Sequence, residues 1–294
     1  MSLGDTPAVA RRRVRLAIRD ARNAKGFTQG QVADAMDWSL SKVMRIESGE
    51  VTISQNDLRP LLTYLGIRDR AVVESLVLSA KASKQRRQWW DEPRFQGMLT
   101  PAMRQLIGFE AEATVIRHFY PMFFPGVLQT REYARGIMEQ YSHELTPKEM
   151  DARIEARIRR KQGLLQRQPR PRIFTLLDAS VLLRTNGIGD NNLGRQLAEV
   201  TEAIKDGWLA ARIYPFDKPH PGIGTFEILY LETEDVTHAV LYRESLVLDE
   251  IVEEAPRIQQ HRALWDRMWS AAISDARSAE MISARAEELL GTDR

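Results

Sequence analysis

Hydrogen-bonding side chains recur at helical spacing in the stretch WSLSKVMRIESG, near the beginning of the chain. Val43 and Ile46 are its apolar positions, three residues apart, and they define the buried side of a helix. Ser41 and Arg45 then leave the helix on the other side. A guanidinium can pair bidentately with a guanine edge, and a hydroxyl suits either a base or a phosphate. The chemistry that this pattern favours is therefore binding to DNA.

The predicted contact surface extends to the neighbouring helix end. Gln29 lies at the amino end of the preceding helical segment, where backbone N–H groups and the helix dipole favour a phosphate. The predicted DNA contacts are Gln29, Ser39, Leu40, Ser41, Lys42 and Arg45. The alternative interpretation is a helical bundle in which the third helix is only solvated.

Capping residues and glycines set the helices that must position these side chains. Thr28 and Gln31 have the spacing of a capping box, so a helix begins there. Ser39 caps the next helix, and Gly26 and Gly49 end the first and third helices. Two later helices are predicted at about residues 54–65 and 68–84, the second with apolar positions Val72, Leu76 and Leu78. Five short helices with a tight turn between the second and third form a helix-turn-helix layout.

The segments TQGQVADAM, WSLSKVMRIESG and LLTYLGI resemble the XRE class of repressor-type helix-turn-helix domains, over about residues 9–70. The resemblance implies that Gln29 contacts a phosphate and that Lys42 contacts the DNA backbone. It also implies that Leu40, Ser41 and Arg45 face the bases. Leu40 and Met44 depart from the polar residues that many relatives carry. Such apolar side chains would pack on a thymine methyl group or against a partner protein.

The composition is that of an ordinary globular chain with two domains. Its 294 residues are 43% hydrophobic and 28% charged, and the sequence has no cysteine, so it forms no disulfide or thiolate site. No apolar run is long enough for a membrane span or signal peptide, which favours a cytoplasmic protein. Residues 1–90 carry 16 basic and 9 acidic side chains, a net charge of +7, and the remainder carries 26 and 31, a net charge of −5. This asymmetry favours a polyanionic partner for the first domain.

A basic and aromatic stretch, KASKQRRQWWDEPRFQG, indicates the domain boundary. We therefore expect a helix-turn-helix domain over residues 1–85, a linker over 86–105 and a second domain over 106–294. Trp89 and Trp90 are too large to lie wholly in water without reason. They are expected to anchor on the second domain, or else to form a dimer or partner surface.

The second domain mixes helices and strands. A helical pattern runs from residue 109 through Arg117. Strands rich in apolar residues are predicted at residues 172–178, 211–216, 224–232 and 237–244, and helices at about 147–167, 191–205, 254–273 and 275–290. The expected fold class is mainly α: an amino-terminal five-helix repressor-like bundle and a carboxy-terminal α+β, or mixed α/β, domain with a small sheet. The arginine-rich run of the helix at 147–167 is interpreted as a solvated face, with nucleic-acid binding as the alternative.

This second part resembles the large WhiJ-like domain that follows an XRE domain in many actinomycete regulators described as antitoxin-like. The resemblance lies in PGVLQTREYAR, the arginine-rich helix, FTLLDASVLLR, GTFEILYLE and VLYRE, within about residues 105–285. Phe124 departs from the aliphatic residue that is usual there. Such regulators commonly pair with a small partner protein, so the resemblance implies that this domain senses a signal, binds a partner or dimerises.

No catalytic or metal-binding motif is found in the sequence. The five histidines, His118, His143, His220, His238 and His261, lack ligand spacing, so each is expected to be a surface or satisfied polar residue. No cofactor is expected. A DNA-tethered transferase remains a third alternative, because strand ends often converge on a cleft. Its candidate residues are Asp178, Arg184, Tyr214, Glu227 and Glu244.

The function that these patterns favour is a sequence-specific transcriptional regulator of double-stranded DNA that is not an enzyme. A homodimer is expected, because helix-turn-helix units usually read two half-sites. The alternative in the binding class is an antitoxin-like adaptor whose main act is capturing a small partner protein. A polar site of converging Arg, Tyr and Glu residues would instead favour the transferase.

Overall fold

The chain folds as two units, Met1–Gln88 and Trp89–Arg294. The structure is a computed structural model, and it describes residues 7–84, 88–141, 145–185, 187–220, 222–244 and 249–291. Residues 89–105, which the sequence predicts as part of a linker, lie in the second unit. No helix in the described part of the chain is both long and apolar enough to cross a membrane.

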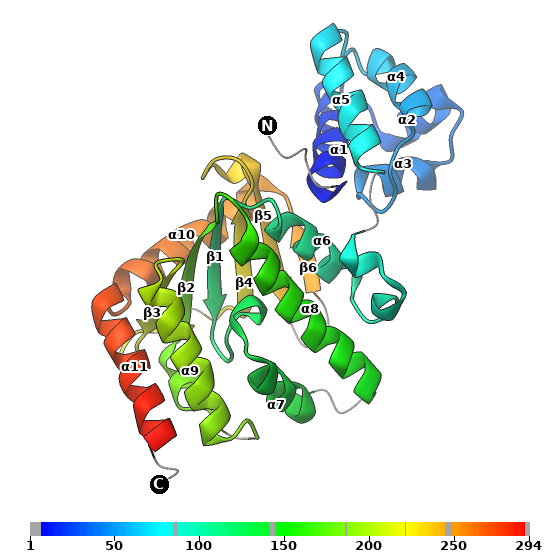
Figure 1. Cartoon of the computed structure of the whole chain (residues 1–294). Helices are drawn as coiled ribbons and strands as arrows, with labels where there is room; N and C mark the ends of the chain where they lie inside the picture. The colour runs from blue at the N-terminus through cyan, green and yellow to red at the C-terminus, as the bar shows by residue number, and fades with distance from the viewer. Residues whose placement is uncertain are drawn as a thin grey trace. The chain divides into compact units, whose positions relative to one another are not determined.

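The first unit contains five helices among the described residues, as predicted. They are α1 (Pro7–Ala24), α2 (Gln29–Met36), α3 (Leu40–Glu47), α4 (Gln55–Tyr64) and α5 (Arg70–Ala82) (Figure 1). The predicted capping box is present, because the Thr28 side chain accepts from the Gln31 backbone and the Gln31 side chain accepts from Thr28. Asp37 adopts a left-handed conformation with φ of 53° and ends α2. Ser39 then caps α3 by accepting from the backbone N–H of Lys42.

The core of the first unit fixes how α2 and α3 cross. Val32 and Ala33 of α2 pack in one cluster with Val43 and Ile46 of α3. These buried positions leave the opposite side of α3 in solvent. The predicted apolar positions of α5 are only partly correct, because Leu76 is buried whereas Val72 and Leu78 are 46% and 65% exposed. The buried stripe of α5 continues instead through Val77 and Ala80, which share the face of Leu76.

The second unit is built on a six-stranded sheet with the order β3-β2-β1-β4-β5-β6. The strands are β1 (Val115–Tyr120), β2 (Arg172–Asp178), β3 (Leu209–Tyr214), β4 (Thr225–Tyr230), β5 (Ala239–Glu244) and β6 (Asp249–Val252). Strands β1, β2 and β3 are parallel, and β4, β5 and β6 add to the other side of β1 in antiparallel pairs. The predicted α+β class is confirmed.

The central strand was predicted wrongly. The sequence pattern predicts a helix from residue 109 through Arg117, but α6 (Pro101–Glu110) ends before it and β1 begins at Val115. Nearly every residue of β1 is buried, because helices cover both faces of the sheet around it. A strand buried on both faces lacks the simple apolar–polar alternation that marks a half-exposed strand. The short strand β6 was also missed.

The two faces of the sheet differ in chemistry. Helix α10 (Ala255–Ala271) packs on one face with an apolar cluster that includes Phe119, Ile228, Leu241 and Trp265. Helix α8 (Pro147–Gln166) crosses the opposite face (Figure 1). The remaining elements of the second unit are η1 (Trp89–Asp91), η2 (Pro93–Phe95), η3 (Gly126–Leu128), α7 (Arg131–Tyr141), η4 (Ala179–Leu182), α9 (Asp190–Lys205), η5 (Val236–His238) and α11 (Asp275–Gly291).

The tryptophan pair anchors the beginning of the second unit. Trp90 is 8% exposed, and the Trp89 ring meets the rings of Trp90 and Phe95 edge-on at centroid distances of 5.3 and 5.1 Å. Phe95 packs with Ala152 and Ala156 of α8. The expectation that these tryptophans anchor on the second domain is therefore confirmed.

Candidate nucleic-acid interface

The outward side of α3 presents an apolar pair beside two hydrogen-bonding side chains. Leu40 and Met44, one helical turn apart, are 49% and 50% exposed. Ser41 and Arg45 are exposed next to them, one residue further along the helix. Positions four residues apart lie on the same helix face, so these side chains form one continuous surface. We call Leu40, Ser41, Met44 and Arg45 the α3 surface.

The Arg45 side chain is available to bind an external partner. Its side chain makes no hydrogen bond or ion pair with the part of the chain that the structure describes, although its backbone carbonyl accepts from Ser48. An exposed arginine without a local carboxylate keeps its donors available for a bidentate acceptor.

Gln29 is oriented by a buried carboxylate. Its Nε2 donates to Oε2 of Glu47 at 2.8 Å, and Glu47 is 6% exposed. Arg22 grips the same carboxylate with two hydrogen bonds of 2.7 and 2.9 Å. Because an amide nitrogen has two hydrogens, Gln29 keeps one donor for a phosphate at the amino end of α2. Sequence reasoning missed the roles of Arg22 and Glu47, which no local spacing reveals because they are 25 residues apart.

Lys42 and Ser39 have local partners. The Lys42 ammonium lies 3.9 Å from the centroid of the Trp38 ring and 3.2 Å from Oδ2 of Asp57. A backbone phosphate therefore competes with these contacts for Lys42. The hydroxyl of Ser39 accepts the capping hydrogen bond from Lys42 N at 3.2 Å, which leaves its own proton available.

The basic charge of the first unit is only partly available to a polyanion. Arg12 and Arg15 of α1 are 8% and 6% exposed. Arg11 and Arg15 donate to the carbonyls of Gly49 and Glu47, where α3 ends, each at 3.4 Å. These arginines stabilise the carboxyl end of α3, and cations there also favour the helix dipole. The net charge of +7 therefore overstates the charge that faces solvent.

Comparison with known families divides the chain into two parts that correspond to the two structural units. Residues 14–76 match a helix-turn-helix domain, which includes α2, α3 and their turn. Residues 103–284, more than half of the chain, match a domain of unknown function, DUF5753. The chain belongs to the DUF5753 family. No curated protein and no solved structure matches it. The helix-turn-helix match supports a DNA-binding regulator, and the DUF5753 region adds no known activity.

Within the DUF5753 region, the structure brings together two of the five residues considered for a transferase site. Glu227 of β4 and Glu244 of β5 lie on the same face of adjacent strands, since Glu227 pairs with Tyr242 and Thr225 pairs with Glu244. Asp178 caps η4 and accepts from Ser180 N. The Tyr214 hydroxyl donates to the Pro219 carbonyl, and its ring packs in the apolar α10 cluster; Arg184 is exposed.

A row of polar side chains crosses the α8 face of the sheet at one register. The row consists of Thr175, His118, Glu227 and Tyr242 on β2, β1, β4 and β5. Tyr120, two residues beyond His118, donates from its hydroxyl to Oε1 of Glu227 at 2.5 Å. The row was not foreseen, but each strand carries its signal as a polar residue inside an apolar run, as in VIRHFY and TFEILY.

The arginine-rich side of α8 covers this row, so its interpretation as a solvated face is wrong. Arg160 is 6% exposed and makes two hydrogen bonds of 2.7 Å with Glu110, which is 1% exposed. Burial lowers the pKa of Arg160, but the charge and hydrogen bonds of Glu110, together with the charges of Glu227 and Tyr120, outweigh burial and raise that pKa. The other cations of the run are also partnered: Arg153 with Met98, Arg157 with Gln129, Arg159 with Glu92, Lys161 with Glu199 and Arg167 with Ala113.

The histidines differ from expectation at one position. His118 is fully buried, and its Nδ1 lies 3.0 Å from the Thr175 hydroxyl. Its Nε2 makes no hydrogen bond with the described residues, but it lies 3.6 Å from Oε2 of Glu227, within ion-pair distance. His220 is exposed, and His238 and His261 are half-buried. His143 lies outside the described residues. Across the described ranges, no group of three or more His, Asp or Glu side chains has the arrangement of a metal site.

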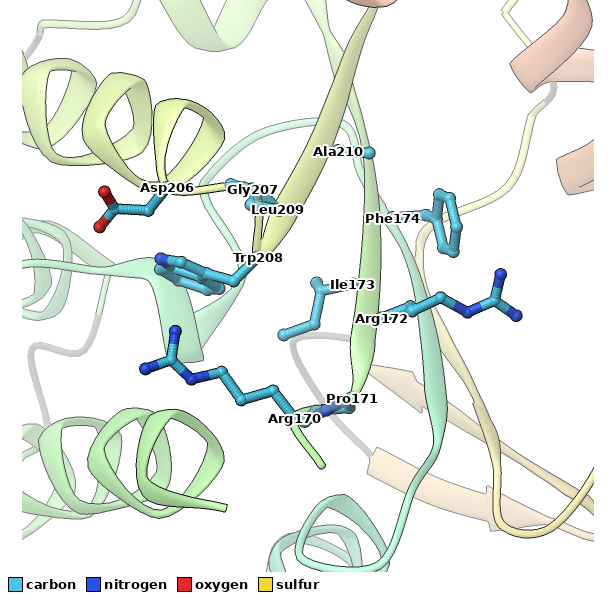
Figure 2. Close-up of a pocket in the computed structure, with 10 residues that line it drawn as sticks. All are labelled: Arg170, Pro171, Arg172, Ile173, Phe174, Asp206, Gly207, Trp208, Leu209 and Ala210. Atoms are coloured by element: carbon cyan, nitrogen blue, oxygen red, sulfur yellow. The ribbon is translucent and has the colours of Figure 1, made fainter. Parts of the chain in front are cut away.

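A separate hollow of about 360 Å³ lies where β2 and β3 begin, lined by residues 170–174 and 206–210. Figure 2 shows Arg170, Asp206 and Trp208 on one side of β2, with Arg172 and Phe174 on the other. Its polar side chains are engaged elsewhere or exposed: Arg170 donates to the Leu165 carbonyl, and Asp206 is exposed. Ligands of α/β sheets bind at the carboxyl ends of parallel strands, and this hollow is at the amino ends.

Proposed function

We propose that the chain is a sequence-specific transcriptional regulator that places α3 in the major groove of double-stranded DNA. The observation that supports this most directly is the α3 surface, where Arg45, whose side chain has no partner among the described residues, lies beside Ser41, Leu40 and Met44. The major groove admits one α-helix and presents both hydrogen-bonding edges and thymine methyl groups. A helix with an arginine beside an apolar pair matches both features.

Each side chain has a separate role in this proposal. Arg45 binds a guanine edge, and Ser41 donates to a neighbouring base or phosphate. Leu40 and Met44 pack on thymine methyl groups. Gln29, held by Glu47, donates its second hydrogen to a phosphate. Lys42 and Ser39 contact the backbone, with Lys42 exchanging Asp57 for a phosphate.

The DUF5753 region supplies regulation in this account. The regulator acts in the cytoplasm as a homodimer, because paired helix-turn-helix units read two half-sites about one helical turn apart. Its large domain dimerises and receives a signal or a small partner protein, as the resemblance to WhiJ-like antitoxin-like regulators suggests. The chain acts by binding and not by catalysis, which agrees with the closed Arg160–Glu110 and Tyr120–Glu227 pairs in the domain.

The salt dependence of DNA binding tests this function. Electrostatic binding to phosphates releases counterions, so the logarithm of the binding constant falls linearly with the logarithm of salt concentration, by about 0.9 per neutralised phosphate. We expect the full chain to show such a slope on duplex DNA and to select a defined sequence from a random library. A flat salt response, or no enriched sequence, contradicts a sequence-specific DNA-binding function.

A further inference from the structure

The hollow where β2 and β3 begin is large enough for a small ligand. Its volume of about 360 Å³ lies within the range of about 300–1,000 Å³ that is typical of ligand pockets. The connection from α8 to β2 supplies Arg170, and the connection from α9 to β3 supplies Asp206 and Trp208. The buried side chain of Ile173 also lines it. Because α/β sheets bind their ligands at the opposite edge, the case for a site rests on these side chains alone.

The Trp208 ring offers an aromatic surface on which no other side chain stacks. It is half-buried, and it makes no ring contact, cation–π contact or hydrogen bond with the part of the chain that the structure describes. Each of the other five tryptophans contacts an aromatic ring or a lysine. Gly207, with φ of 74°, turns the chain directly after α9 and so brings Trp208 to the hollow. An indole ring in this position can stack on a flat ligand.

Arg170 is fixed by one nitrogen and keeps the other two available. Its Nε donates to the Leu165 carbonyl at 2.9 Å, whereas Nη1 and Nη2 have no hydrogen bond or ion pair with the described residues. A proline on either side restricts its backbone. Figure 2 shows the Arg170 side chain extending toward the Trp208 ring, yet no cation–π contact joins the two, so they do not fill the hollow themselves. The terminal nitrogens can therefore donate to a pair of acceptors on a ligand.

Asp206 adds a hydrogen-bond acceptor on the other side of the ring. It caps the carboxyl end of α9, where its backbone N–H donates to the Glu202 carbonyl at 2.8 Å. Its carboxylate is exposed and makes no hydrogen bond or ion pair within the described ranges. A negative charge at a helix carboxyl end opposes the helix dipole, so the helix gains no stability from it. In Figure 2, Trp208 lies between Asp206 and Arg170, so a ligand stacked on the indole meets an acceptor on one side and donors on the other.

Among flat ligands, guanine matches this set of groups. Its N7 and O6 form a pair of acceptors on one edge, for which arginine is the usual bidentate partner. Its N1–H and its N2 amino group are donors on another edge, which a carboxylate accepts. Adenine carries a donor beside N7, and cytosine and thymine lack the pair of acceptors. Every base has a flat face that stacks on an aromatic ring, so stacking supplies affinity and the two edges supply the choice of base.

We propose that this hollow binds a guanine base, with Trp208 stacking on its face, Arg170 donating to N7 and O6, and Asp206 accepting from N1 and N2. Binding forms and breaks no covalent bond. The base reaches the hollow as a free nucleoside or nucleotide, or as an unpaired base of a nucleic acid. The site goes beyond the proposed function and does not rest on it, because it uses no residue of the α3 surface.

Isothermal titration of the full chain with guanosine, inosine and 7-deazaguanosine tests the proposal. Inosine lacks the amino group that donates to Asp206, and 7-deazaguanosine lacks the N7 acceptor of Arg170. We expect both analogues, and adenosine, to bind about tenfold more weakly than guanosine. Asp206→Ala should no longer distinguish inosine from guanosine, and Arg170→Ala should no longer distinguish 7-deazaguanosine from guanosine. Arg184→Ala, which changes an exposed arginine of the same unit, should distinguish all three as the unchanged chain does.

Three results overturn the site: guanosine does not bind, adenosine binds equally well, or the Arg170 and Asp206 variants discriminate as the unchanged chain does. The analogue comparison on the unchanged chain decides the matter if a variant fails to fold. Guanosine monophosphate and a thymidine oligonucleotide with one guanine separate the two sources of the base, with Asp206→Ala as the control for binding elsewhere. A chain that selects an operator but binds no guanosine contradicts this inference alone, and one that binds guanosine but selects no operator contradicts the proposed function alone.

Discussion

The α3 surface and the polar face of the sheet use arginine in opposite ways. Arg45 is exposed and its side chain has no partner in the described part of the chain, whereas Arg160 is buried and makes two hydrogen bonds of 2.7 Å with Glu110. An arginine whose guanidinium donors are unpaired can bind a partner molecule, whereas an arginine whose donors are satisfied by a buried carboxylate stabilises the fold. Arg157 lies between these cases, half-buried with part of its fork filled. The difference predicts which substitutions change binding and which change folding.

The largest expected effect is on the stability of the second unit. Arg160→Ala leaves the buried Glu110 carboxylate without its partner, and breaking a buried pair in this way costs about 3–5 kcal/mol. Denaturant unfolding of the second unit, followed by tryptophan fluorescence, measures this cost. Arg45→Ala is the matched control and should lie within about 0.5 kcal/mol of the unchanged chain, as exposed substitutions do. Equal stability of the two variants would show that the pair at Arg160 is not structural.

A smaller effect is expected at the carboxylate that organises the DNA-binding unit. Glu47→Ala removes the acceptor of Arg22 and Gln29, and hydrogen bonds to a charged group contribute about 1.5–3 kcal/mol. We expect the first unit to lose stability by this amount and DNA affinity to fall because Gln29 is no longer oriented. Gln29→Ala is the control, since it should lower DNA affinity with little loss of stability. An unchanged melting temperature of the Glu47 variant would contradict this role.

The apolar half of the α3 surface gives the next effect. Replacing thymine by uracil in the selected operator removes only the methyl group, and burial of one such group is worth about 0.8 kcal/mol. We expect the DNA affinity of the unchanged chain to fall when thymine is replaced by uracil at one or two operator positions. At the position that Leu40 contacts, the same replacement should not change the affinity of Leu40→Ala. The same holds for Met44→Ala at the position that Met44 contacts. Competition binding with uracil-substituted duplexes measures this. Uniform tolerance of uracil would leave Leu40 and Met44 without a role in reading.

The smallest predicted effect is a pH dependence from Glu244. Burial raises the pKa of its carboxyl in the folded chain, so folding favours the protonated form. That contribution to stability is complete below the ordinary glutamate pKa of about 4.3 and is lost as pH rises through the raised value. Glu244→Gln should therefore equal the unchanged chain in acid and be more stable at neutral pH. Melting temperatures of both chains across this pH range test the sign, and a less stable variant at neutral pH contradicts it.

Local signals explain what the sequence could predict. The Thr28 capping box, the cap at Ser39 and the apolar pair Val43 and Ile46 act within a few residues, and they place the α3 surface correctly. The contacts that orient the side chains beside this surface join residues that are distant in sequence, because Glu47 binds Arg22, 25 residues away. Contacts at such separation leave no trace in local spacing.

The second unit was harder to predict for a related reason. Strand β1 is buried on both faces, and its polar residues His118 and Tyr120 are explained only by Glu227, which lies on β4. In sequence, the arginines of α8 resemble a solvated face. Helical periodicity cannot show that Glu110, at the end of α6, forms a hydrogen bond with Arg160 in the folded chain. A polar residue inside an apolar strand was the available signal, and its meaning depends on strand order.

Parallel binding measurements on Arg45→Ala and Lys42→Ala, each on the selected operator and on random duplex DNA, test the central claim most directly. If Arg45 binds a guanine edge, Arg45→Ala costs about 1–3 kcal/mol on the operator, relaxes preference at one base pair and leaves random DNA almost unaffected. Lys42→Ala should weaken both DNAs alike and reduce the salt slope by about one. Equal loss by Arg45→Ala on operator and random DNA would show that Arg45 contacts only phosphate, and the α3 surface would then not be the reading surface.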